Sequence, residues 1–151
     1  MVLGIIADTH GLMRPEALQA LSGVSAVIHA GDVGSTAVLD ALAAIAAVHA
    51  IRGNVDRAGA LAKLPATRVV RAGEARLYVL HDLAELTIDP AAKGFHAVIS
   101  GHSHHPRNEV RGGVLYLNPG AAGPRRFRLP VAVARLHVDG LALRPEMLTL
   151  A

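Results

Sequence analysis

The chain has 151 residues, of which 52% are hydrophobic and 18% charged, a balance that excludes intrinsic disorder and favours a single domain over residues 1–151. Its formal charge is +3, and the absence of cysteine excludes disulfides, thiolate metal sites and cysteine nucleophiles. No apolar run reaches the roughly 18 residues of a membrane span, and no signal peptide is expected, so we predict a cytoplasmic protein that stays out of membranes.

The first half of the sequence alternates strand and helix patterns. Apolar runs predict strands at 2–7, 25–29 and 47–51, with helical segments between them at 14–21 and 35–46. Pro15 suits the first turn of a helix, and Ser35 is a suitable N-cap. Strands that alternate with helices in this way are expected to run parallel with right-handed crossovers.

The second half is richer in strands. These are predicted at 67–72, 75–81, 95–100, 107–111, 113–118, 130–138 and 141–147, with a short helix near 84–92. Glycine-containing turns at 72–74, 111–113 and 138–140 indicate hairpins. The simplest arrangement is two sheets packed together with helices on the outside.

Polar side chains with metal-binding groups follow the ends of several predicted strands. They are Asp8, His10, Asp32, Asn54, His81, His102 and His104. Ligands of α/β sheets bind outside the carboxyl ends of the strands, so we expect these side chains to converge on one rim. Nitrogen and oxygen ligands without sulfur suit Mn, Fe, Co, Ni or Zn better than Ca.

In chain order the pattern Asp-x-His, Gly-Asp, Gly-Asn, strand-end His and Gly-His-x-His resembles the signature of the calcineurin-like metallophosphoesterases. The resemblance is to the small, stand-alone phosphodiesterases of bacteria and archaea, and it extends from Asp8 to the segment 117–120. It implies an α/β fold, a four-layer α/β/β/α sandwich of two mixed sheets flanked by helices. It also implies hydrolysis of phosphoric esters by a dinuclear centre and a metal-bridging hydroxide, with Mn expected first and Ni, Fe, Zn or Co as alternatives.

The same resemblance implies a role for each ligand. Asp8, His10 and His104 would bind the first metal, Asn54, His81 and His102 would bind the second, and Asp32 would bridge them. Asp32, Asn54 and His102 would act closest to the reaction.

Neighbouring polar residues are expected to support these ligands. His29 should pack against or orient a ligand, and Asp56 should have a structural or supporting role. Asp82 could add a carboxylate near the second metal or cap a turn. Ala121 replaces a serine of the family pattern and removes a hydroxyl.

Val55 is the most informative departure from the family pattern. Many relatives have a histidine at this position, and it protonates the leaving group. Valine cannot donate a proton, and general-acid help is typically worth about 10²–10⁴-fold. The loss should harm poor alkoxide leaving groups more than acidic ones, which favours a phosphodiesterase over a protein phosphatase.

Two other functions remain open. A retromer subunit has this fold with a degraded metal site and serves as a protein-binding scaffold, whereas every candidate ligand position here keeps a side chain that can bind metal. The basic cluster at 125–128 supports a nuclease, but two Phe and two Tyr offer few stacking platforms. That cluster can equally be a solvated loop or a subunit contact. We expect a small phosphodiester substrate rather than nucleic acid, and a homodimer.

Overall fold

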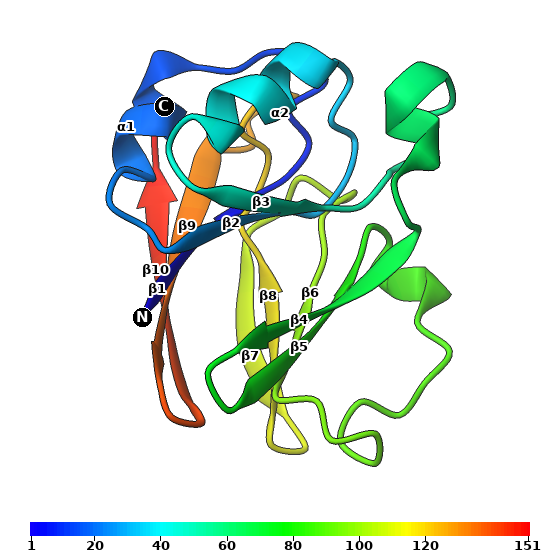
Figure 1. Cartoon of the computed structure of the whole chain (residues 1–151), viewed down its shortest axis with the longest axis vertical. Helices are drawn as coiled ribbons and strands as arrows, with labels where there is room; N and C mark the ends of the chain where they lie inside the picture. Colours follow the sequence, from blue (N-terminus) through cyan, green and yellow to red (C-terminus); the bar gives the residue numbers. More distant parts are fainter.

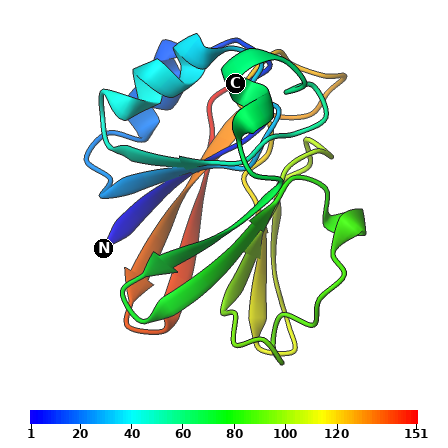
Figure 2. The same cartoon turned by 45° about the vertical axis from the view of Figure 1, so that its right-hand side comes forward.

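The computed structural model describes residues 1–151, which form two five-stranded sheets packed face to face (Figures 1 and 2). The elements in chain order are β1 (Val2–Ile6), α1 (Pro15–Ala20), β2 (Ala26–His29), α2 (Thr36–Ala43), β3 (Ala47–Ala50), the 3₁₀ turn η1 (Gly59–Lys63), β4 (Thr67–Ala72), β5 (Ala75–Leu80), the 3₁₀ turn η2 (Leu83–Glu85), β6 (Ala97–Ile99), β7 (Arg107–Arg111), β8 (Val114–Asn118), β9 (Ala132–Asp139) and β10 (Ala142–Thr149).

The first sheet has the strand order β10-β9-β1-β2-β3. Strands β1, β2 and β3 are parallel, as the alternation of strands and helices predicted, with Ile5 opposite Ile28. Strand β9 pairs antiparallel with β1, and β10 pairs antiparallel with β9 through the hairpin predicted from the turn at 138–140. Three parallel strands therefore end at the same edge of this sheet.

The second sheet has the order β4-β5-β6-β8-β7 and a similar plan. Strands β5, β6 and β8 are parallel, while the predicted hairpins place β4 and β7 antiparallel at the two edges. Both sheets are therefore mixed. The carboxyl ends of β1, β2 and β3 lie close to those of β5 and β6.

The main core lies between the two sheets because alternate residues of each strand face inward. Leu3, Ile5 and Ile28 of the first sheet pack into one buried cluster with Leu77 and Ile99 of the second. Aliphatic side chains fill this layer, as the 3% aromatic content requires.

Helices cover only the outer face of the first sheet (Figure 2). Leu21, which directly follows α1, and Leu42 of α2 pack in a second cluster with Ile6 and Val27 of the sheet. The Ser35 side chain accepts a hydrogen bond from the Ala37 N–H, which confirms it as the N-cap of α2. No helix of the chain is long and apolar enough to cross a membrane.

The prediction of a helix near 84–92, on the outer face of the second sheet, is wrong. Only η2 forms there, and Leu83 and Leu86 cover the small cluster that includes Leu80. Pro90 lacks a backbone donor and disfavours a helical residue before it, so the helix cannot continue through this segment. The fourth layer of the sandwich is therefore a 3₁₀ turn and irregular chain.

Candidate metal centre

The loops after β1 and β2 are bonded to one another along the rim of the first sheet. The Asp8 N–H donates to the Gly31 carbonyl at 3.0 Å, and the His10 N–H donates to the Asp32 carbonyl at 2.9 Å. The Gly11 N–H donates to Val33 at 2.8 Å. These bonds continue the parallel pairing beyond the strands and hold the side chains of both loops at fixed positions.

The backbone at most candidate ligands is left-handed. Positive φ angles of 46–70° occur at Asp8, His10, Asp32, His102 and His104, and the one other non-glycine residue of this kind is Phe127. Such a conformation costs an L-residue roughly 1–2 kcal/mol, although Asp and His tolerate it better than most residues. Strain concentrated in this way marks a site where the fold imposes side-chain direction.

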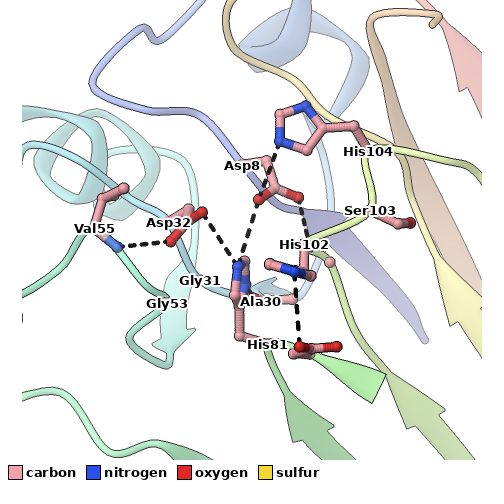
Figure 3. Close-up of polar contacts among 12 residues, drawn as sticks. Asp8, Ala30, Gly31, Asp32, Gly53, Val55, His81, His102, Ser103 and His104 are labelled. Carbon is pink, nitrogen blue, oxygen red and sulfur yellow. Dashed lines mark hydrogen bonds and ion pairs between the residues drawn. The ribbon is translucent and has the colours of Figure 1, made fainter. Parts of the chain in front are cut away.

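The first group of side chains surrounds one oxygen of Asp8. Asp8 Oδ1 lies 3.6 Å from His104 Nε2 (Figure 3). It also lies 3.8 Å from His10 Nε2. Their ligand atoms all lie within 4.8 Å of one another, close enough for a single cation. The family resemblance implied these same residues as ligands of the first metal.

The second group consists of Asp8, Asp32 and His81. His81 Nε2 lies 3.8 Å from Asp8 Oδ1 and 3.2 Å from Asp32 Oδ2 (Figure 3). His10 Nε2 lies 3.5 Å from the same Asp32 oxygen. Asp32 Oδ2 therefore lies between a histidine of each predicted set, where a bridging ligand would have to be.

The orientation of His81 is set by a backbone contact. The Ala30 carbonyl lies 2.7 Å from His81 Nδ1 and accepts its proton, which leaves Nε2 facing the carboxylates. Burial alone would lower the pKa of His81, but the adjacent Asp32 carboxylate and the hydrogen bond to the Ala30 carbonyl outweigh it and raise the pKa. Burial also opposes ionisation of Asp32, yet contacts with His81 and the Val55 N–H lower its pKa to about 2.

Several ligand atoms of the site are buried without a hydrogen-bond partner. They are Asp8 Oδ1, His10 Nε2, His81 Nε2 and, on the far side of its ring, His104 Nδ1. Burial raises the pKa of Asp8 to about 7, against the attraction of His81. Unpartnered buried polar atoms are costly, and a cation among them would remove that cost for Asp8, His10 and His81. The donor set therefore fits a divalent metal ion.

His102 lies outside both groups, which consist of carboxylates and imidazoles, and Asn54 is an amide. Asn54 is exposed and lines a pocket with His81 and Asp82. The His102 side chain is 44% exposed, its ring packs edge-on against His81, and its Nε2 lies 3.7 Å from Asp82 Oδ2. The structure thus brings the predicted second set only part of the way together.

Asp82 caps a turn, which is one of the two functions considered for it. Its Oδ1 accepts a hydrogen bond from the Ala84 N–H at 3.0 Å and caps η2, while Oδ2 faces His102. Its side chain is placed between the pocket that contains Asn54 and the one that contains His102.

His29 lies beneath the first two loops and joins them. It is fully buried, its Nδ1 accepts the Gly31 N–H at 3.1 Å, and its Nε2 lies 3.0 Å from Thr9 Oγ1. The Thr9 hydroxyl donates to Val33, so it accepts the proton of His29 Nε2. Burial lowers the pKa of His29 to about 4, so the ring is neutral and orients the ligand loops.

The buried carboxylate of Asp56 holds two loops of the site together. Asp56 is buried and accepts hydrogen bonds from the N–H groups of Val33, Gly34 and Gly53 at 2.9–3.0 Å, which ties the loop after β3 to the loop after β2. Asp56 is therefore structural, as its sequence context suggested.

Asn118 secures the loop that contains His102 and His104. Its Nδ2 donates to the Gly101 carbonyl at 2.9 Å and to Ser103 Oγ at 3.2 Å. The family resemblance extends to the segment 117–120, but no role was predicted for Asn118. A polar residue at the end of β8, directly before Pro-Gly, was the available signal.

Val55 lies beside the site, with its N–H donating to Asp32 Oδ1 at 3.1 Å (Figure 3). Val55 is 49% exposed. An apolar side chain therefore meets solvent at the position where the family resemblance led us to look for a proton donor. The backbone at this position orients Asp32, whereas the side chain contributes no acid.

Arg126 is a site neighbour that sequence reasoning did not place. Burial is the main cause that lowers the pKa of His104 to about 4, and the positive charge of Arg126 is the next. Arg126 also acts on Asp8. Only the folding of a distant loop brings this guanidinium to the rim.

Comparison with known proteins gives a consistent result. The sequence profile described as "Calcineurin-like phosphoesterase superfamily domain" matches residues 1–140. A probable metallophosphoesterase from Methanothermobacter thermautotrophicus is 31% identical over 160 residues, which covers 98% of this chain and 92% of the relative.

Solved structures share the fold at lower identity. Vps29 from Entamoeba histolytica, in a structure with Zn²⁺, has a TM-score of 0.77 at 22% identity and covers 99% of both chains. The Escherichia coli phosphoesterase YfcE has a TM-score of 0.72 at 23% identity, covering 92% of this chain and 90% of its own. These neighbours match the predicted sandwich of two mixed sheets.

Proposed function

This chain belongs to the calcineurin-like phosphoesterase superfamily, and we propose that it is a phosphodiesterase that uses two divalent metal ions. One observation carries the proposal. Asp8 Oδ1, buried and without a hydrogen-bond partner, faces the Nε2 atoms of His10, His81 and His104 at 3.6–3.8 Å. A site of this composition needs a cation and offers ligands for more than one.

In this proposal Asp8, His10 and His104 hold the first ion, and His81 with Asn54 and His102 holds the second, while Asp32 serves both. Divalent ions at such a site supply an activated water molecule and neutralise charge on the phosphoryl oxygens. The protein contributes fixed geometry. The Ala30 carbonyl and the Val55 N–H orient His81 and Asp32 through direct hydrogen bonds.

The exposed side of the site is where a substrate would enter. Asn54 and His102 each line an open pocket next to Asp82, so a phosphoryl oxygen can approach the ion that they would hold, and the Asn54 NH₂ group can donate to it. We therefore place the ester groups of the substrate along the rim that these two pockets form.

The preference for diesters rests on Val55. A phosphodiester with an acidic leaving group departs as a stable anion and needs no proton from the protein. Esters with alkoxide leaving groups do need one, and the exposed Val55 side chain cannot supply it. The proposed substrates are therefore small diesters of acidic leaving groups.

The test is hydrolysis of bis(4-nitrophenyl) phosphate after removal of metal and reconstitution with Mn²⁺ or Ni²⁺. We expect activity to return with metal and to be lost in Asp32→Asn. Asp40→Asn, an equal change on the exposed side of α2, should retain it. If no diester in a broad panel is hydrolysed by metal-loaded protein, the chain is not a phosphodiesterase.

The second candidate function is a protein-binding scaffold, which the fold shared with Vps29 supports. A scaffold does not need metal ions at this site for chemistry. Tight binding of metal without hydrolysis of any diester would favour it. The cytoplasmic location, the homodimer and the choice of Mn stay predictions from the sequence.

A further inference from the structure

One aromatic side chain is left in solvent near the candidate metal centre. Phe127 is 89% exposed, whereas Tyr78, Phe95 and Tyr116 are buried or partly buried. Its φ of 55° is unfavourable for a bulky L-residue, and no packing compensates. An exposed and strained aromatic residue is a candidate for ligand contact.

The loop that contains Phe127 starts at the metal centre itself. The Gly123 N–H donates to the Asp8 carbonyl at 3.2 Å, and Arg14 holds the Gly123 carbonyl at 3.3 Å. Residues 124–130 then project beyond the strand ends (Figure 2). We call residues 124–130 the arginine–phenylalanine loop.

The second half of this loop lies next to the segment that contains the ligand histidines. Phe127, Arg128 and Leu129 line a shallow pocket together with His105, which directly follows His104. The exposed ring is therefore close to the segment that bears a candidate metal ligand. A molecule with one phosphate at the metal centre can extend a second group onto this surface.

The loop is strongly positive. Arg125, Arg126 and Arg128 are exposed, and none of them pairs with a carboxylate, since the arginine ion pairs of the chain lie on β7 and β9 instead. Unpaired guanidinium groups beside a phosphate site favour a ligand with negative charge beyond the scissile phosphate.

We propose that the arginine–phenylalanine loop binds a nucleotide, with the base on Phe127 and the phosphates on its arginines, and that the bond hydrolysed is the phosphoanhydride of a nucleoside diphosphate ester. This inference rests on the proposed function. Aromatic side chains stack on any nucleobase, and arginines provide the accompanying charge.

The missing proton donor at Val55 agrees with a phosphoanhydride. The oxygen of water forms a bond to one phosphorus, and the bond from that phosphorus to the bridging oxygen breaks. The second phosphate keeps the bridging oxygen and its electron pair and leaves as a monoester. One water molecule is consumed, two phosphate monoesters form, and its protons pass to the products or to solvent. A phosphate monoester leaves without protonation by the protein, unlike an alkoxide.

The experiment uses diadenosine diphosphate as substrate and its methylene-bridged analogue for equilibrium binding by calorimetry. We expect Phe127→Ala to weaken binding of the analogue about 10- to 100-fold, while Phe127→Tyr retains it, because stacking needs an aromatic face. Arg126→Ala should weaken it about 10-fold or more. Arg71→Ala and Leu141→Ala, on other exposed parts of the chain, should match wild type.

Hydrolysis of bis(4-nitrophenyl) phosphate is measured in parallel to separate the two proposals. If the wild type hydrolyses this diester but neither binds nor hydrolyses the dinucleotide, the nucleotide inference is wrong and the phosphodiesterase stands. If the analogue binds and the binding depends on Phe127 but no ester is hydrolysed, the nucleotide site stands and the proposed chemistry fails.

Two other occupants of the loop would overturn the inference. Sedimentation of wild type and Phe127→Ala tests a subunit contact, which is indicated if the variant alone is monomeric and binds the analogue normally. Binding of single-stranded oligonucleotides without binding of the dinucleotide analogue would assign the loop to nucleic acid instead.

Discussion

The two sides of the candidate metal centre are built differently. On one side Asp8, His81 and His104 are buried on rigid strand ends, and their rings and carboxylates face one another at 3.6–3.8 Å. On the other side Asn54 and His102 are exposed, and the nearest charged partner of His102 is Asp82 at 3.7 Å.

This contrast suggests that the buried side binds metal and that the exposed side admits the substrate. The buried side has its geometry imposed by left-handed backbone and by cross-loop hydrogen bonds, so it is organised before any ligand arrives. On the exposed side the side chains of Asn54 and His102 reach solvent, although the backbone of His102 is left-handed too and its N–H donates to Asp8 Oδ2 at 3.0 Å. We therefore expect the buried side to determine metal affinity and the exposed side to determine occupancy of the second site and substrate choice.

The largest expected effect is the loss of metal from Asp8→Asn, because Asp8 belongs to both groups of ligands. Bound Mn²⁺ should fall from two ions to none, and diesterase activity should fall by more than the roughly 10- to 100-fold typical of residues that only support a ligand. Asn54→Ala should lose one ion. Elemental analysis after dialysis measures both, and equal losses in the two variants would show that the sides do not differ.

Removing the support of the rigid side should destabilise the fold. Asp56→Ala leaves the N–H groups of Val33, Gly34 and Gly53 without their acceptor, and we expect the free energy of unfolding to fall by about 3 kcal/mol or more. Urea unfolding measures this loss. Asp40→Ala, which removes the same charge from an exposed helix position, should change stability by less than about 0.5 kcal/mol. A similar loss in both variants would argue against a structural role of Asp56.

The buried His29 should make the metal-free protein sensitive to acid. Its pKa is about 4 when folded and 6.5 as an ordinary value, so the unfolded chain binds the proton more tightly. Stability should fall as pH decreases from 6.5 towards 4, by up to about 3 kcal/mol from this group. In His29→Gln the urea midpoint should change less with pH between 6.5 and 4 than in wild type. In His49→Gln the midpoint should follow wild type. A parallel pH profile of His29→Gln and wild type would contradict the prediction.

The smallest effect is expected at the exposed side. Val55→His places an imidazole where an apolar side chain now meets solvent, and it should raise monoesterase activity relative to diesterase activity by about 10-fold, a fraction of full general-acid catalysis. Rates with glycerol 2-phosphate, a monoester whose alkoxide leaving group needs a proton, and with bis(4-nitrophenyl) phosphate give the ratio. Val55→Phe controls for bulk, and an unchanged ratio in Val55→His would mean that the missing acid does not set the preference.

Local patterns in the chain were sufficient for most of the fold. Apolar runs located the strands, and glycine turns located the hairpins that place β4, β7 and β10 at sheet edges. The helix near 84–92 was wrong because helical composition there was outweighed by Pro90, which ends any helix that reaches it. Hydrophobic periodicity alone does not register such a stop.

The candidate ligands were also predictable, because strand ends that bear Asp and His are local features. Their division into a closed and an open side was not, since it depends on which residues are buried once two sheets meet. Likewise, nothing near Arg126 or Phe127 in the sequence indicates that the loop after Gly123 begins at Asp8.

The sequence by itself determined the chemistry available at the rim: which side chains can bind metal, that Val55 cannot donate a proton, and that residues 125–128 are basic. Only the tertiary structure decided how these groups are combined. Asp8 and Asp32 face shared histidines because parallel pairing of β1 with β2 continues into their loops, and Phe127 stays exposed because no other part of the chain packs on it. Side-chain identity is a local property, whereas burial and distance arise from contacts between residues far apart in the chain.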